Sequence, residues 1–381
     1  TNINMDHVVK IKKGLDIQLE GIPSPKISNT PDSQLYAIIP DDFVGLTPKV
    51  IVKPGEKVLT GSPVIHDKTH PNIVVPSPVS GEIVTIERGE RRKVIKITIK
   101  PDASQQALEF GRFDLENMDS SEIKDLLLKS GIFAFIKQRP YDIVANPDTA
   151  PRDIFVTAFD SAPLAPDYAF ILKEEKQHFE TGLKALNKLT SGKVYVGISQ
   201  RQPIDVKNAT SVIFDGPHPA GNVGIQINHI APINKGDTVW TMSALDVLFI
   251  GRLFDKGIAD FSRIVAVTGS EIDDPHYVRT RIGASIASIT QGMVKAVEYE
   301  QRYISGNVLT GVKTNADGYI GATHSQITVI PEGNNYDEFL GWASLNPHKY
   351  STSHSYFSWL LGKKKKYTID ARIRGGERAI I

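Results

Sequence analysis

The chain has 381 residues, of which 40% are hydrophobic and 23% charged, a balance typical of globular domains. Its formal net charge is +1, so no overall field would attract nucleic acid, and we expect no nucleic-acid partner. The sequence has no cysteine, which excludes disulfides, thiolate zinc sites, cysteine-ligated iron–sulfur clusters and a cysteine nucleophile within it. No run reaches the roughly 18 consecutive apolar residues of a membrane-spanning helix, because Asp246 and Arg252 interrupt the most apolar stretch, residues 245–254.

The first hundred residues predict a small β barrel or sandwich. Short runs of alternating apolar residues are cut by Pro and Gly at close spacing, as in LYAIIP, PKVIVKPG, EIVTIERG and RKVIKITIK. Residues 52–86 resemble the carrier domains that swing a lipoyl or biotinyl arm, with Lys68 where the modified lysine would stand. The loop around Lys68 continues into Pro71, which makes it longer and more rigid than an attachment hairpin. We therefore favour a docking or scaffold barrel with Lys68 unmodified over a carrier.

Residues 101–258 predict a parallel α/β domain. A helix is expected from residue 120, capped by Ser120 and Ser121. Residues 152–159 predict a buried strand, residues 167–190 one long helix, and residues 193–199 and 211–216 two further strands. Alternation of short apolar strands with helices favours a Rossmann-like sheet.

Residues 259–332 predict a small α+β unit, with strands in RIVAVTGS, YISGNVLTG and GYIGATHSQITVIPEG. The segment from Asp273 to His276 is interpreted as a helix start, because acidic residues and proline suit the first turn of a helix. Residues 333–381 form a C-terminal region without a long helix. The predicted divisions are thus 1–100, 101–258, 259–332 and 333–381.

A glycine-rich loop, residues 214–224, follows the last strand of the α/β region, where such folds bind ligands. It is not a GxGxxG motif, and two prolines remove N–H groups that would cradle a phosphate. Nucleotide binding, a rigid loop that presents His218 to a partner or flat ligand, and a plain turn all remain open. The candidates for contact with a ligand or a partner are Gly216, Pro217, His218, Pro219, Gly221, Asn222, Gly224 and His229.

No catalytic residue and no metal site is predicted. His218 and His229 could meet in space, but two histidines without cysteine or ordered carboxylates are a weak metal signal. No nucleophile elbow, P-loop or HExxH motif is present.

The C-terminal region places aromatic residues directly before a lysine run. Such a pattern suits contact with an anionic membrane surface or a membrane-protein partner, although a solvated loop is the plainer alternative. The residues proposed for this contact are Tyr356, Phe357, Trp359, Lys363, Lys364, Lys365 and Lys366.

Taken together, these stretches resemble one family over nearly the whole chain: the NqrA family, whose members are subunits of the bacterial Na⁺-translocating NADH:quinone oxidoreductase. The stretches that carry the resemblance are KIKKGLDIQLEGIP, DKTHPNIVVPSPVSGEIVTIERGERR, FDGPHPAGNVGIQINHIAPI, VWTMSALDVLFIGRLF, RTRIGASIASIT and FLGWASLNPHKYSTSHSYFSWLLG. The resemblance implies a multidomain α/β and α+β fold: a biotinyl-like barrel-sandwich, a Rossmann-like domain related to the flavoprotein subunit of respiratory complex I, and a soluble-ligand-binding β-grasp (SLBB) domain. Family members continue beyond residue 381, so the chain is expected to be C-terminally truncated.

The resemblance also implies a function. A six-subunit complex passes electrons from NADH to ubiquinone, using flavins and iron–sulfur centres, and exports Na⁺. This chain would be a peripheral subunit on the cytoplasmic face of the bacterial inner membrane, itself not catalytic and holding no cofactor. Three hypotheses stay open: docking on the other subunits, especially a membrane-embedded one, while shaping the quinone site; direct binding of quinone or flavin; and a carrier modified on Lys68. We favour the first.

Overall fold

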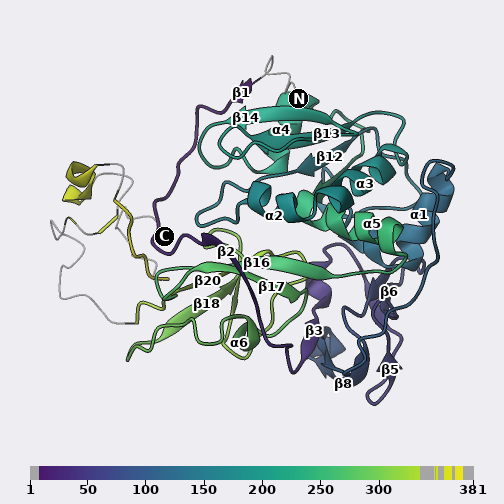
Figure 1. The fold of residues 1–381 in the computed structure, drawn as a ribbon, viewed down its shortest axis with the longest axis horizontal. Coiled ribbons are helices and arrows are strands. Elements are labelled where there is room, and N and C mark those ends of the chain that lie inside the picture. The colour runs from purple at the N-terminus through teal and green to yellow at the C-terminus, as the bar shows by residue number, and fades with distance from the viewer. Residues whose placement is uncertain (1–7, 335–346, 348, 351–355, 363–364, 372–381) are drawn as a thin grey trace.

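The computed structural model describes residues 8–334, 347, 349–350, 356–362 and 365–371, and its strands form four sheets (Figure 1). The multidomain α/β and α+β class expected from the sequence is confirmed. The two smaller sheets lie together at the lower right of the view, below the seven-stranded sheet and beside the six-stranded one, and a layer of helices lies beside the largest sheet. The segment that ends at residue 371 returns toward the N-terminal segment.

The barrel consists of a four-stranded sheet in the order β3-β9-β8-β5 and a three-stranded sheet in the order β4-β6-β7. Its strands are β3 (Tyr36–Ile38), β4 (Pro48–Val50), β5 (Lys57–Val58), β6 (Pro63–Asp67), β7 (Val74–Pro76), β8 (Gly81–Arg88) and β9 (Val94–Pro101). Fully buried isoleucines fill its interior, at positions 65, 83, 97 and 99. The close Pro and Gly spacing of the sequence thus produces short strands around a compact β-branched core.

The α/β region contains a seven-stranded sheet in the order β1-β14-β13-β12-β15-β10-β11. Its strands are β1 (Val8–Lys10), β10 (Lys137–Arg139), β11 (Ile143–Val144), β12 (Ile154–Thr157), β13 (Val194–Ser199), β14 (Thr210–Asp215) and β15 (Val239–Ser243). The strands from β1 to β15 run parallel, and β10 and β11 close one edge antiparallel. From β12 the chain moves outward through β13 and β14, and then returns to place β15 on the other side of β12.

The helices of this region are α1 (Ser120–Lys129), α2 (Tyr168–Glu174), α3 (Lys176–Asn187), α4 (Val223–Ile230) and α5 (Ala244–Lys256). The cap of α1 is Asp119, whose side chain accepts a hydrogen bond from Glu122 N at 2.9 Å, so the expected caps Ser120 and Ser121 were wrong by one residue. The single long helix expected over residues 167–190 is two helices, broken at Glu175. The partly buried carboxylate of Glu175 accepts a hydrogen bond from Arg252 Nη2 at 2.9 Å. This contact joins residues far apart in the chain, so the residues around Glu175 do not predict it.

The third unit is a six-stranded sheet in the order β19-β18-β20-β16-β17-β2. Its elements are β2 (Ser24–Asn29), β16 (Ser262–Thr268), β17 (His276–Arg281), α6 (Ile286–Ile289), β18 (Gln301–Ser305), β19 (Val312–Thr314) and β20 (Gln326–Pro331). The expected helix start at Asp273 to His276 was wrong, because His276 begins β17 and pairs with β16 and β2. Pairing of this buried segment with strands on both sides outweighs the local helix-start signal.

The N-terminal segment belongs to neither barrel sheet. β1 pairs with β14 in the seven-stranded sheet, and β2 pairs with β17 in the six-stranded one. Near the other end of the chain, Tyr367 forms a bridge with Leu19, and Thr368 Oγ1 donates to Glu20 at 2.7 Å. The first described residues therefore link the two larger units before the barrel begins.

Phe135, which is 3% exposed, lies where the three units meet. Its ring centroid is 5.4 Å from that of Phe43 in the barrel, 5.2 Å from Phe249 on α5, and 6.0 Å from Phe261 beside β16. Most buried apolar residues of all three units belong to one continuous core. The units are consequently packed as one body.

We expect Phe135→Ala to lower the free energy of unfolding by about 3–5 kcal/mol, because it removes a ring buried among three aromatic neighbours. Phe357→Ala is the matched control, since that ring is 44% exposed and its loss should change stability by less than about 0.5 kcal/mol. Urea unfolding followed by circular dichroism measures both. Equal effects of the two substitutions would contradict the central position of Phe135.

Candidate ligand pocket

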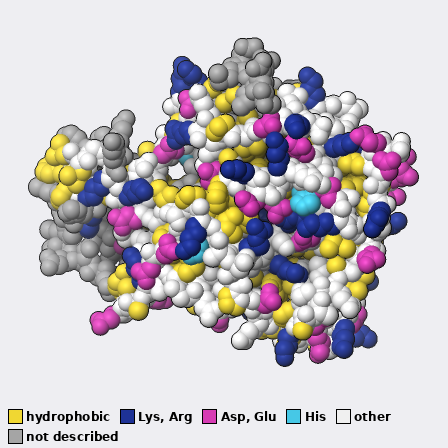
Figure 2. Space-filling model, in the orientation of Figure 1, with side chains coloured by type: hydrophobic (Ala, Val, Ile, Leu, Met, Phe, Trp, Pro, Cys, Tyr) yellow, Lys and Arg dark blue, Asp and Glu magenta, His cyan; other side chains and the backbone are white. Residues whose placement is uncertain are grey.

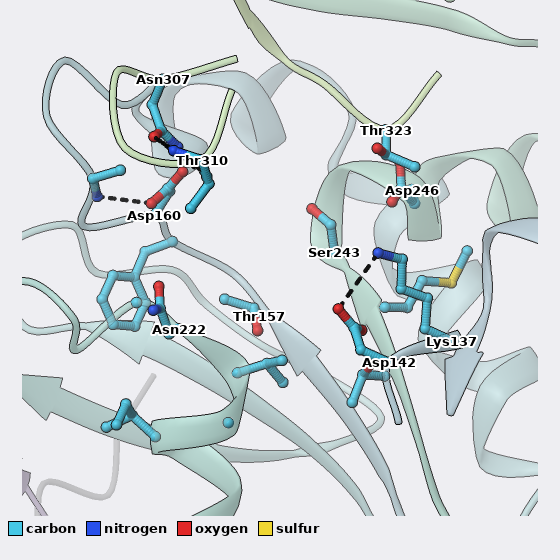
Figure 3. A pocket seen from close by; sticks show the side chains of 18 of the residues that line it. Lys137, Asp142, Thr157, Asp160, Asn222, Ser243, Asp246, Asn307, Thr310 and Thr323 are labelled. Carbon is cyan, nitrogen blue, oxygen red and sulfur yellow. Dashed lines mark hydrogen bonds and ion pairs between the residues drawn. The ribbon is translucent and has the colours of Figure 1, made fainter. Parts of the chain in front are cut away.

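A cavity of about 730 Å³ lies between the seven-stranded sheet and the loops of the β-grasp unit (Figure 3). This volume is within the range of pockets that take small molecules or cofactors. The residues that line it include Phe135, Lys137, Arg139, Asp142, Thr157, Phe159, Asp160, Tyr168, His218, Gly221, Asn222, Gly224, Met242, Ser243, Asp246, Asn307, Leu309, Thr310 and Thr323. Five separate segments of the chain thus line one cavity.

The topology of the sheet places the cavity. Thr157 ends β12 and Ser243 ends β15, and both line the cavity. These two parallel neighbours are the point at which the strand order reverses, and loops that leave them in opposite directions open a crevice outside their carboxyl ends. Hydroxyl groups of Thr157 and Ser243 lie at the middle of this crevice in Figure 3.

One end of the cavity is built by the glycine-rich loop and the turn after β12. His218 Nδ1 lies 3.0 Å from Ser161 Oγ, which also accepts a hydrogen bond from Gly221 N at 2.8 Å. Asp16 holds the loop from behind, because its carboxylate accepts from His218 N at 2.8 Å. Hydrogen bonds to Ser161 on one side and to Asp16 on the other therefore hold the glycine-rich loop in place.

Asp160 is the acidic group at this end. Its carboxylate accepts a hydrogen bond from Ala162 N at 2.8 Å, and no basic side chain of the described residues forms an ion pair with it. Burial raises the pKa of Asp160, and the hydrogen bond from Ala162 and the charge of His218 lower it by less. Burial also raises the pKa of the neighbouring Tyr168, and the Asp160 carboxylate raises it further.

The opposite end carries cations. Lys137 Nζ lies 3.8 Å and Arg139 Nη2 3.2 Å from the Asp142 carboxylate, at the hairpin of β10 and β11. Asp246, on the first turn of α5, faces the same end and is neutralised by a buried ion pair with Arg263 of β16. In Figure 3 Lys137, Asp142 and Asp246 lie across the cavity from Asp160. A ligand here would meet a polar group at each end and the rings of Phe135 and Phe159 on its walls.

The glycine-rich loop contributes four of its predicted contacts to the cavity: His218, Gly221, Asn222 and Gly224. Gly216, Pro217 and Pro219 belong to the loop but are not among the lining residues. His229 lies on α4 away from the cavity, exposed, with its ring 2.8 Å from Ile225 O. The histidine pair considered for metal is therefore not brought together, and the described residues contain no cluster of three or more potential ligands.

Sequence reasoning missed several lining residues, among them Asp160, Lys137, Tyr168 and Ser243. Asp160 and Ser243 follow adjacent strands at their carboxyl ends, which is the signal that could have located them. To use this signal, one must know that β15 lies beside β12. The local sequence does not show that the two strands are neighbours, because several elements separate them along the chain.

Lys68 lies exposed in the loop between β6 and β7. The buried Asp67 beside it accepts hydrogen bonds from Thr47 N at 2.7 Å and His70 N at 2.9 Å, which fixes the loop. His70 is also 3.6 Å from Asp148 of the α/β region. That Lys68 is unmodified stays a prediction.

The C-terminal aromatic residues lie on the short 3₁₀ helix Phe357–Leu361, in a lobe at the left of Figure 1. Tyr356 is buried, whereas Phe357, Leu360 and Leu361 are 44%, 63% and 48% exposed. Of the lysines, Lys365 is partly buried, Lys366 is exposed, and Lys363 and Lys364 lie outside the described residues, as does the side chain of Trp359. Figure 2 shows apolar side chains on this lobe beside basic ones.

Within the described residues, none of the helices combines the length and the apolar character needed to cross a bilayer. The fold and its cavity define a class: a multidomain α/β protein with a barrel-sandwich, in which a Rossmann-like unit and a β-grasp unit together line a ligand-sized pocket. Three family models match consecutive parts of the chain. They are the NqrA N-terminal barrel-sandwich hybrid domain at residues 9–102, the NqrA second alpha/beta domain at 118–259, and the NQRA C-terminal domain at 264–316.

Whole-chain relatives agree with these matches. The chain is 37% identical to the NqrA subunit of the Na⁺-translocating NADH-quinone reductase of Serratia proteamaculans, and 35% identical to those of Yersinia pestis and Neisseria meningitidis. Each alignment covers 98% of this chain and 84% of the relative. The chain therefore belongs to the NqrA family of Na⁺-translocating NADH-quinone reductase subunits. Two solved chains of NAD⁺-reducing [NiFe]-hydrogenase align with TM-scores of 0.35 and 0.37 at 8% identity, covering 48% and 60% of this chain and 41% and 53% of the hydrogenase chains, a likeness too distant to add to this assignment.

The close approach at Gly221 offers a test of the loop geometry. A Cβ at Gly221 would lie 2.5 Å from Ser161 N, so we expect Gly221→Ala to push the two turns apart and to lower the free energy of unfolding by about 1–3 kcal/mol.

Gly224 is the matched control, because nothing lies within 4 Å of its Cβ position and it is in the first turn of α4. Gly224→Ala should stabilise the protein by about 0.5–1 kcal/mol, through the lower entropy of its unfolded chain. Thermal unfolding of the two variants at one pH compares them. A Gly221→Ala protein as stable as the wild type would contradict the packing described.

Proposed function

We propose that this chain is a peripheral subunit of the Na⁺-translocating NADH:quinone reductase, on the cytoplasmic face of the membrane, and that it supports electron transfer from NADH to ubiquinone coupled to Na⁺ export. Its first role is to dock on the other subunits, especially a membrane-embedded one. Its second is to receive the quinone ring in the cavity at the ends of β12 and β15. The chain itself holds no flavin and no iron–sulfur centre, so the electrons pass through neighbouring subunits. Family membership over 98% of the chain is the observation that carries this proposal.

The exposed side of the C-terminal 3₁₀ helix supports docking. Leu360 and Leu361 expose apolar side chains without covering a core, and Lys366 lies exposed nearby. Apolar groups beside cations suit the junction between an apolar protein surface and anionic headgroups. The segment is anchored, because Tyr367 N donates to Gln18 O at 2.9 Å.

We expect the double substitution Leu360→Asp and Leu361→Asp to leave the fold unchanged and to reduce co-purification of the other subunits at least tenfold, since it places two desolvated charges in the interface. Ile51→Asp, at an exposed barrel position, is the control and should assemble normally. Affinity purification from membranes, with quantification of every component of the complex, measures the effect. Assembly and quinone reduction that both survive in the double variant would refute docking through this segment.

The form of the cavity supports quinone binding. A quinone ring is flat and apolar with a carbonyl oxygen at each end, and the cavity has aromatic walls with polar groups at both ends. His218 lies at the Asp160 end, and Lys137 at the other. Binding of flavin in the same cavity is the alternative, because the switch point of a parallel sheet accommodates nucleotides as well.

The chain has three tryptophans, Trp240, Trp342 and Trp359, and Trp240 directly precedes Thr241 and Met242, which line the cavity. Titration of the purified chain with ubiquinone-1 should quench the intrinsic tryptophan fluorescence saturably at micromolar concentration, and His218→Ala should weaken the affinity about tenfold, the cost of roughly one hydrogen bond. His229→Ala, away from the cavity, is the control. A flavin spectrum in the purified chain would favour the alternative, and a mass increase on Lys68 would favour the carrier hypothesis.

A further inference from the structure

Asp160 is a carboxyl group without an ion pair among the described residues, and binding of a quinone does not by itself require such a group. Its carboxyl group lines the cavity beside the Ser161–His218 pair, and the described residues give it a hydrogen bond from backbone but no ion pair. The other carboxylates of the cavity are neutralised: Asp246 by Arg263, and Asp142 by Arg139. A buried acid without an ion pair tends to keep its proton.

We propose that the Asp160 carboxyl group is the proton donor to one carbonyl oxygen of the bound quinone. This inference rests on the proposed binding of quinone in the cavity. Reduction of a quinone to a quinol takes two electrons and two protons. The electrons come from NADH through the neighbouring subunits, Asp160 gives one proton to the nearer carbonyl oxygen and becomes a carboxylate, and water at the Lys137 end supplies the second proton.

The neighbours of Asp160 suit such a step. Raised pKa values at both Asp160 and Tyr168 favour their protonated forms, and both side chains line the cavity. Asn307 and Thr310, from the β-grasp loop, lie near Asp160 in Figure 3 and are held to each other by a hydrogen bond of 3.2 Å. The charged groups across the cavity are Lys137, Arg139, Asp142 and Asp246.

His218 is placed to return the proton. Its ring is partly exposed, hydrogen-bonded to Ser161, and close enough for its charge to lower the pKa of Asp160. After transfer, the Asp160 carboxylate attracts a proton from solvent through this histidine. Asp160 thus takes up a proton from the glycine-rich loop and releases it to the quinone in the cavity.

The decisive variant is Asp160→Asn in the assembled complex. The amide oxygen still accepts from Ala162 N, so the turn is retained, and the amide N–H still donates to a quinone oxygen, but it has no proton to release. We expect the Kd for ubiquinone-1, from quenching of the intrinsic tryptophan fluorescence of the purified chain, to change less than about threefold, and NADH-driven ubiquinone-1 reduction by the complex to fall about 100-fold at pH 7, as for loss of a general acid. NADH oxidation by ferricyanide should be unchanged, because the uptake of electrons from NADH does not involve this chain.

The dependence of the rate of quinone reduction on pH distinguishes a loss of proton donation from a change in packing. In the wild type, the rate of quinone reduction should fall as the pH rises through the raised pKa of Asp160, because the proton is then lost before quinone arrives. Asp160→Asn should abolish this limb, and Asp205→Asn, at a carboxylate paired with Lys176 outside the cavity, should retain it.

Two results would overturn the inference in distinguishable ways. Saturable quinone binding together with a wild-type rate and wild-type pH limb in Asp160→Asn would refute proton donation and leave quinone binding intact. No saturable binding by the wild type would refute both.

Discussion

The contact of Phe135 with one aromatic ring from each neighbouring unit is the constraint on which the pocket depends. Phe43 comes from the barrel, Phe249 from α5 and Phe261 from the start of the β-grasp unit, so the three units can adopt one relative placement that packs all four rings. Arg263 extends the cluster, since its guanidinium lies 5.0 Å from the Phe249 ring centroid while it pairs with Asp246. A buried ion pair contributes little net stability, but it penalises every alternative placement in which either charge is left alone.

This arrangement explains why the cavity exists without a sequence motif. The strand ends of β12 and β15 form its floor, the glycine-rich loop one end, and residues 307–310 of the β-grasp unit its cover. Each part alone is an ordinary turn or strand end. The cavity therefore arises from the packing of the units, and the aromatic cluster includes Phe135, which is itself a lining residue.

The sequence predicted those elements that depend on interactions between residues close together in the chain. Short strands between Pro and Gly, the apolar face of α1 and the alternation in the α/β region all appear in the structure, because spacing and burial periodicity determine them. The break at Glu175 and the strand at His276 were missed because a distant arginine and a neighbouring sheet decide them. Within the glycine-rich loop, the sequence located His218, Gly221, Asn222 and Gly224 but not Asp160, whose role as a lining residue depends on strand order rather than on its neighbours.

The packing of the barrel against the other units distinguishes it from a carrier domain. A carrier must move its lysine between distant sites, so its domain is tethered by a flexible linker and makes few lasting contacts. Here the barrel shares a continuous apolar core with the other units through Phe43 and Val75, and Asp42 accepts a hydrogen bond from Ala322 N at 2.8 Å in the β-grasp unit. Release of the barrel would expose that core and leave the Ala322 amide without its partner. The barrel is thus packed as part of one body, in contrast to a carrier domain on a flexible tether.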